Sequence, residues 1–138
     1  MILVCQNACC GLPSPHAREP TPSLVGVGDR RTIYEARARA DATAYGPQRR
    51  LAELWVLLGD PNAALRYARR SVALMPVTLD AMAGSTTRQS LAEAEIAAGQ
   101  LDSATAHVAT LLRIPSALSE AAVRIDPLWA PLRANVLR

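Results

Sequence analysis

The segment from residue 51 to 76, LAELWVLLGDPNAALRYARRSVALMP, constrains the fold of this chain more than any other. Apolar residues recur at three- and four-residue steps on both sides of a Gly59-Asp60-Pro61 turn, which is the spacing of one helix face. The segment therefore predicts two amphipathic helices folded back on each other. Because the apolar faces of such a hairpin are buried only by neighbouring helices, we expect an all-α chain of stacked hairpins.

Capping residues and helix breakers predict further helices along the chain. Asp29 and Asp60 are expected N-caps, glycines are expected to end helices, and prolines stop them. The helices expected from these signals span residues 29–45, 47–58, 61–75, 86–98 and 101–114, and residues 77–85 are expected to be a linker. A last short helix after Asp126 is expected to be split by Pro131 into a terminal lid.

Composition agrees with one helical domain. Half of the 138 residues are apolar, mostly Ala, Leu and Val, and Ala and Leu are strong helix formers. All basic residues are arginine, and the net charge of +3 is concentrated in the first half. A basic half is compatible with a nucleic-acid partner, but acidic residues alternate with the arginines, so we interpret it as solvated helix faces. No apolar run approaches the ~20 residues of a membrane span.

The N-terminal segment, residues 1–28, has no helical period and is rich in proline, so an irregular or disordered tail is expected there. The helical domain is expected over residues 29–138. Four residues of the tail could be considered as metal ligands, but their spacing does not suit a zinc site: Cys5, Cys9, Cys10 and His16. We expect free thiols, no metal and a reducing cytoplasmic location, because the tail lacks the features of a signal peptide.

The segment from residue 91 to 115, LAEAEIAAGQLDSATAHVATLLRIP, repeats the first hairpin. When Gly59 is aligned with Gly99, small or apolar residues coincide in both helices. The coinciding pairs are Leu51 with Leu91, Ala52 with Ala92, and Ala64 with Ala104. A repeated supersecondary unit is typical of a helical repeat protein.

This pattern resembles the tetratricopeptide repeat. The small residues and turn glycines occupy the family's positions, Trp55 matches its late aromatic residue in the first helix, and Pro76 matches its closing proline. The second copy departs from the pattern, because Glu95 stands where an aromatic residue is usual. Gly59 and Gly99 are also forty residues apart, against about 34 in the family. The resemblance implies a short α-solenoid of antiparallel helix hairpins that binds other proteins.

The C-terminal stretch resembles the closing segment of tetratricopeptide arrays in bacterial multidomain regulators. The matching residues are IPS at 114–116 and DPLWAPLR at 126–133. In those regulators the array follows a protein kinase, nucleotide cyclase or winged-helix domain. The resemblance implies that this chain is a detached or truncated C-terminal part of a bacterial regulatory protein. An orphan fragment without independent function is the other interpretation, because about three repeats are needed for a stable array.

Signatures of enzymes and cofactor sites are missing from the sequence, so we expect no catalytic activity and no cofactor. His107 lies on a helix among small apolar residues, where a packing role is the usual one. Glu93 and Glu95 are two residues apart and are expected to point to different helix faces.

A peptide-binding groove is the site that the resemblance implies. The family's concave face is formed by the first helix of each hairpin. Its candidate residues here are Arg49, Glu53, Val56, Gln89, Glu93 and Ile96. We therefore expect a protein–protein interaction scaffold with a protein or peptide partner, and a nucleic-acid module using the arginine-rich first half is the alternative.

Overall fold

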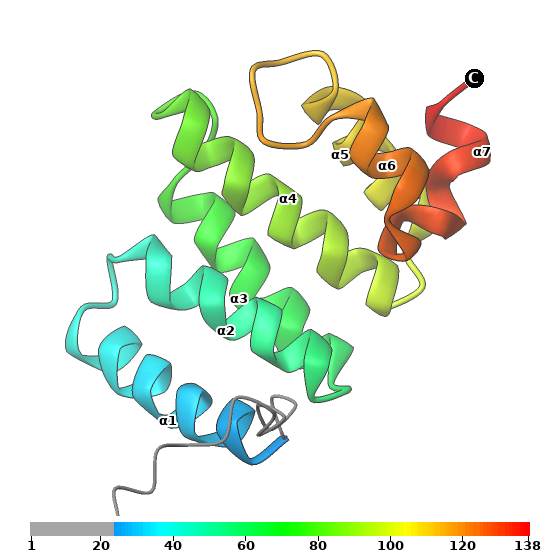
Figure 1. Ribbon diagram of the computed structural model, residues 1–138. Helices are drawn as coiled ribbons and strands as arrows, with labels where there is room; N and C mark the ends of the chain where they lie inside the picture. The colour runs from blue at the N-terminus through cyan, green and yellow to red at the C-terminus, as the bar shows by residue number, and fades with distance from the viewer. Residues whose placement is uncertain (1–23) are drawn as a thin grey trace, which may run out of the picture.

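A computed structural model describes residues 24–138, and in this part of the chain the fold is entirely helical (Figure 1). The α-helices, in chain order, are α1 (Leu24–Ala40), α2 (Tyr45–Leu57), α3 (Pro61–Leu74), α4 (Ala81–Ala97), α5 (Leu101–Leu111), α6 (Glu120–Ile125) and α7 (Arg133–Val136). A 3₁₀-helix, η1 (Pro127–Leu132), joins α6 to α7. Within residues 24–138, none of the helices has the length and apolar character needed to cross a bilayer.

Helices α1 to α4 each pack against the next helix in the chain, because short turns reverse the direction of the chain between them. Helices α2 and α4 also contact each other although α3 separates them in sequence. They therefore form one side of the molecule, with α3 and α5 behind them in the view of Figure 1. This arrangement brings the first helices of the two predicted hairpins side by side.

The turns of the two hairpins have the same geometry. Gly59 and Gly99 have positive φ angles of 79° and 75°, which residues with a side chain rarely adopt. The N–H of Gly59 donates to the carbonyl of Val56 at 3.2 Å, and that of Gly99 donates to Ile96 at 3.0 Å. The prediction that these glycines end the first helix of each hairpin is confirmed.

The first two helices begin earlier than the sequence suggested. Helix α1 starts at Leu24 rather than Asp29, and residues 1–23 of the expected tail lie outside the described residues. The sequence predicted that Gly46-Pro47 ends α1. This prediction is wrong, because Gly46-Pro47 lies in the first turn of α2. The break falls at Asp41, whose carboxylate accepts from the N–H of Thr43 at 2.9 Å and from its hydroxyl at 2.6 Å. These hydrogen bonds lower the pKa of Asp41.

The expected linker at residues 77–85 is wrong, because α4 already begins at Ala81. Its N-cap is Asp80, whose side chain accepts from the N–H of Ala83 at 2.8 Å. Gly84 lies inside the helix where α4 passes the end of α3. A Cβ atom on Gly84 would come within 2.4 Å of the backbone nitrogen of Val77. The early helix start therefore depends on close backbone packing that only glycine permits.

Two core clusters of buried side chains hold the helices together. The first cluster lies between α2, α3 and α4, and its buried members are Ala52, Ala64, Leu65, Ala68, Leu91 and Ala94. The second lies between α4, α5 and the C-terminal elements, and its buried members are Ala92, Ala104, Val108, Leu111, Leu118, Val123, Trp129 and Leu132. Small alanines allow the helices to approach closely in both clusters.

The C-terminal elements close the second core cluster. Pro131 lies in η1, and the following α-helix is only four residues long, so the predicted split into a short lid is confirmed. Helix α6 was not expected from the sequence. Its N-cap is Ser119, whose hydroxyl accepts from the N–H of Ala122 at 3.2 Å. A helix of six residues is too short to show a helical period in the sequence.

Candidate functional site

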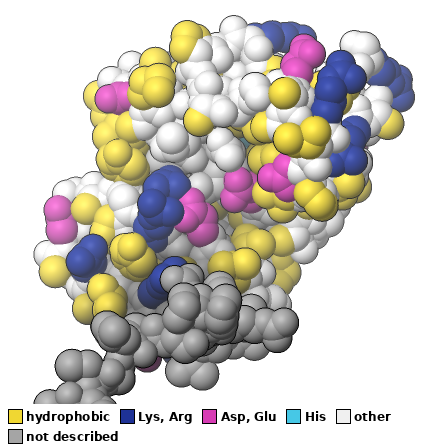
Figure 2. All heavy atoms as spheres, in the orientation of Figure 1, with side chains coloured by type: hydrophobic (Ala, Val, Ile, Leu, Met, Phe, Trp, Pro, Cys, Tyr) yellow, Lys and Arg dark blue, Asp and Glu magenta, His cyan; other side chains and the backbone are white. Residues whose placement is uncertain are grey.

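The six groove residues expected from the sequence lie on α2 and α4, the two helices that contact each other. All six are half-buried rather than fully exposed: Arg49, Glu53, Val56, Gln89, Glu93 and Ile96. Figure 2 shows arginine and acidic side chains meeting near the middle of this side of the molecule, with apolar side chains around them. Val56 packs against the first core cluster and Ile96 against the second. The four polar residues are therefore the ones that can offer hydrogen bonds or charges to a ligand.

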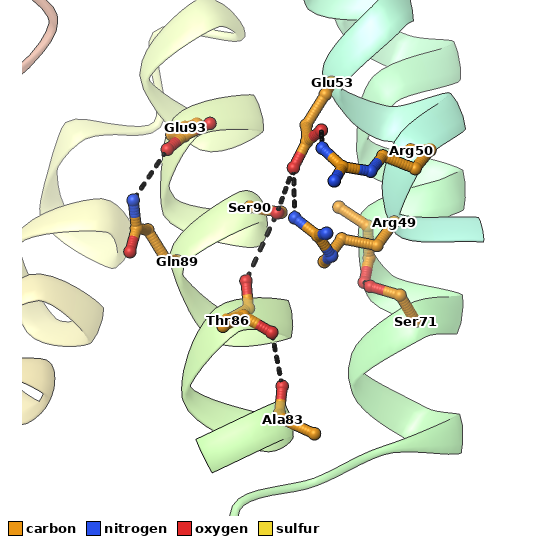
Figure 3. Close-up of polar contacts among 10 residues, drawn as sticks. Arg49, Arg50, Glu53, Ser71, Ala83, Thr86, Gln89, Ser90 and Glu93 are labelled. Atoms are coloured by element: carbon orange, nitrogen blue, oxygen red, sulfur yellow. Dashed lines mark hydrogen bonds and ion pairs between the residues drawn. The ribbon is translucent and has the colours of Figure 1, made fainter. Parts of the chain in front are cut away.

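Glu53 is the centre of a polar network between α2 and α4 (Figure 3). Its carboxylate accepts hydrogen bonds from Arg49 and, at 2.9 Å, from Arg50, both on α2. The hydroxyl of Ser90 on α4 lies 3.3 Å from the same carboxylate and 3.2 Å from the carbonyl of Thr86, so it shares its one hydrogen between these two acceptors. Because the cations and the hydroxyl approach from two helices, the network fixes the position of Glu53 and joins the two helices. Arg50 was missed although its i,i+3 spacing to Glu53 on one helix is a local signal. Ser90 was missed because only the packing of α2 on α4 brings it to Glu53.

Glu93, on α4, has a hydrogen bond from an amide instead of the ion pairs that Glu53 forms. The amide of Gln89 donates to its carboxylate at 3.2 Å, and in the described part of the chain no arginine is within ion-pair distance of it. Burial raises the pKa of Glu93 above its ordinary value, and the hydrogen bond from Gln89 opposes this effect. The negative charges of Glu53 and Asp126 raise it further, and Arg49 lowers it. Glu93 is thus a half-buried acid without a neutralising partner.

This environment predicts a pH-dependent stability. Below about pH 4.5, Glu93 is protonated in both the folded and the unfolded state and costs no stability. As the pH rises from about 4.5 to the elevated folded-state pKa, the unfolded state releases this proton more readily than the folded state, so stability is lost, and the loss is complete above the folded-state pKa. We expect Glu93→Gln to raise the free energy of unfolding by about 0.5–1 kcal/mol at neutral pH and to have little effect in acid.

Urea denaturation at several pH values measures this difference. Glu120→Gln is the matched control, because that carboxylate on α6 is 68% exposed and should affect stability little at any pH. An equal effect of Glu93→Gln at acid and neutral pH would contradict the electrostatic explanation.

Glu95 points away from the groove, as expected from its spacing to Glu93. It is only 3% exposed and lies against α5, where the hydroxyl of Ser103 donates to it at 2.6 Å. Nε2 of His107 lies 3.5 Å from the same carboxylate oxygen. Glu95 thus forms a buried polar contact between α4 and α5. The half-buried side chain of His107 lies beside this contact.

Other chemistry-bearing residues of the sequence are not brought together in the described structure. The cysteines and His16 lie among residues 1–23, outside the described part. Over residues 24–138, no group of three or more His, Cys, Asp or Glu side chains is arranged to hold a metal ion.

No family model, curated protein or solved structure matches this chain.

Proposed function

We propose that this chain is a tetratricopeptide-like scaffold that binds a peptide of a partner protein on the face formed by α2 and α4. Two features of the fold support the proposal. The two hairpins end their first helices in turns of the same geometry, and these first helices lie side by side. In a solenoid of helix hairpins, such a face is the one left open to a ligand.

The observation that carries the proposal is the contrast between Glu53 and Glu93. Glu53 is neutralised within the fold by Arg49 and Arg50, whereas Glu93 has only the amide of Gln89 as a partner in the described structure. A half-buried carboxylate gains most from a cation that arrives with a ligand, because water already solvates it poorly. We therefore propose a partner segment that places a lysine or arginine side chain on Glu93.

Selection of displayed random peptides on the full chain tests this function. We expect the selected peptides to share a basic residue, and we expect Glu93→Gln to weaken their binding about tenfold, which is the loss of one charge-assisted contact. Fluorescence anisotropy of labelled peptides measures the affinities. The double variant Arg49→Ala plus Glu93→Ala should abolish binding.

Asp102→Asn is the control, because it removes one negative charge from an exposed position on α5, outside the groove. It should leave the affinities within about twofold of the original protein. Peptides that remain bound to the double variant would refute the groove.

The alternative of a nucleic-acid module is less well supported. Several arginines of the first half are engaged within the fold, since Arg31 pairs with Glu35 and both Arg49 and Arg50 pair with Glu53. A phosphate binder would lose affinity steeply with salt, whereas a single buried ion pair in a peptide groove would lose much less. By the resemblance of its closing segment, we further propose that the scaffold serves a bacterial regulatory protein in the cytoplasm.

A further inference from the structure

A pocket of about 450 Å³ lies between α1, α2 and α3, formed by residues other than those of the peptide groove. Small-molecule sites in proteins commonly have volumes of roughly 300–1,000 Å³. The lining residues are Glu35, Ala38 and Arg39 of α1, Ala42 of the following turn, Gln48 and Leu51 of α2, and Tyr67 and Arg70 of α3. Three helices therefore contribute side chains of mixed chemistry to one concave site.

The walls of the pocket combine an apolar surface with two arginines. Tyr67 is half-buried in the wall and the fully buried Leu51 lies behind it, so an apolar ligand group can pack against the Tyr67 ring. Arg39 and Arg70 are exposed, and within residues 24–138 neither forms an ion pair.

The charges of the lining favour an anionic ligand. The one acid of the lining, Glu35, lies 3.7 Å from Arg31 and is therefore already paired. Arg70 is held in place by a hydrogen bond of 3.3 Å to the carbonyl of Ala42, and Arg39 is available from the opposite helix. Guanidinium groups bind carboxylates through parallel hydrogen bonds, so the two arginines define the anionic end of a ligand.

Gln48 supplies a third element of recognition. Its side chain lines the pocket and is only 4% exposed, yet its Oε1 has no hydrogen-bond donor in the part of the chain that the structure describes. Leaving a buried acceptor unsatisfied costs about 1–3 kcal/mol. This oxygen is shielded from solvent, so the amide must rotate toward the pocket for a ligand hydroxyl to donate to it and remove that cost.

We propose that this pocket binds a small hydroxylated carboxylic acid with an apolar body. The carboxylate is bound by Arg39 and Arg70, the apolar body packs on Tyr67, and the hydroxyl donates to Gln48. None of these residues is among the six of the α2–α4 groove, so this site is distinct from the peptide groove.

Titration of the isotope-labelled full chain with 4-hydroxyphenylacetate, followed by amide resonances in NMR spectra, tests the proposal. We expect saturable shifts around Ala38, Leu51 and Tyr67, with a dissociation constant below about 1 mM. The neutral 4-hydroxyphenylacetamide should bind at least tenfold more weakly, phenylacetate should bind more weakly because it lacks the hydroxyl, and inorganic phosphate should cause no saturable shift.

Arg39→Gln should weaken binding of 4-hydroxyphenylacetate about tenfold, because it removes one arginine from the carboxylate. Arg39 makes no hydrogen bond or ion pair within the described residues, so this variant should fold normally. Arg66→Gln is the matched control, since Arg66 is exposed on α3 and does not line the pocket. The proposal is wrong if no saturable shift occurs up to about 10 mM, if phosphate competes with the acid, or if the two variants weaken binding equally.

Discussion

Replacing Trp129 by alanine is expected to lower the free energy of unfolding by about 3–5 kcal/mol. Trp129 is 2% exposed and is the largest of the fully buried side chains in the second core cluster. Its removal leaves a cavity between η1 and α5 that the backbone cannot fill, because Val108 and Leu111 are fixed on one helix. Small domains have total stabilities of only about 5–15 kcal/mol, so this loss is a large part of the whole. Urea denaturation followed by circular dichroism measures it.

Trp55→Ala is the control for this prediction. Trp55 is half-buried at the first core cluster and stacks under the guanidinium of Arg31, 5.3 Å from the ring centre. Less apolar surface leaves water on folding at this position, so we expect a smaller loss than for Trp129. If the two variants lost equal stability, the second core cluster would not be the anchor of the C-terminal elements.

Gly84→Ala is expected to destabilise the fold by about 2–3 kcal/mol, although alanine is the better helix former. The added Cβ atom would lie 2.4 Å from the nitrogen and 2.5 Å from the Cα of Val77, and 2.6 Å from the carbonyl carbon of Pro76. These are backbone atoms, so no side-chain rotation relieves the overlap. The chain between α3 and α4 would have to move away, and the hydrogen bond of 2.8 Å from the hydroxyl of Thr87 to the carbonyl of Met75 would be lost.

Gly46→Ala is the matched control for Gly84. Gly46 also lies in a helix, in the first turn of α2, and a Cβ atom there would meet nothing within 4 Å. The same substitution should therefore be neutral or stabilise the protein by up to about 1 kcal/mol. Thermal unfolding of both variants measures the two changes in stability. A neutral Gly84→Ala would disprove the close packing of α4 on the α3–α4 turn.

The hairpins could be predicted from the sequence because their signals are local. Gly59 and Gly99 mark the turns, and the Asp60-Pro61 pair supplies an N-cap and a first-turn proline. The carboxylate of Asp60 indeed accepts from the N–H of Ala63 at 3.0 Å. Each of these signals acts within a few residues, so no knowledge of the packing is needed.

The beginning of α4 could not be predicted from periodicity. Its first turns contain Gly84, Ser85, Thr86 and Thr87, which are all weaker helix formers than alanine. Packing against the end of α3 offsets these propensities, and the hydroxyl of Ser85 bonds back to the carbonyl of Met82 at 2.7 Å. The one local signal was Asp80, an N-cap three residues before Ala83.

In the candidate site, too, some features could be predicted from the sequence and others depend on packing. The six groove positions on α2 and α4 were implied by the resemblance to the tetratricopeptide repeat, and all six are half-buried there. The hydrogen bond between Ser90 and Glu53, and the burial of Glu95 against Ser103, depend on contacts between helices. Such contacts are set by packing angles and rotamers, which a single sequence does not encode in a readable pattern.

Helix α4 contributes to both core clusters, with Leu91 and Ala94 facing the first and Ala92 facing the second. We therefore expect either end of the molecule to open locally while the other cluster keeps α4 in place, so that opening at one end changes the stability of the other end little. Loss of α4 itself would dissolve both clusters at once. The helix that bears Glu93 is therefore expected to be the last to exchange its amide hydrogens, and a ligand on it would meet the most rigid surface of the molecule.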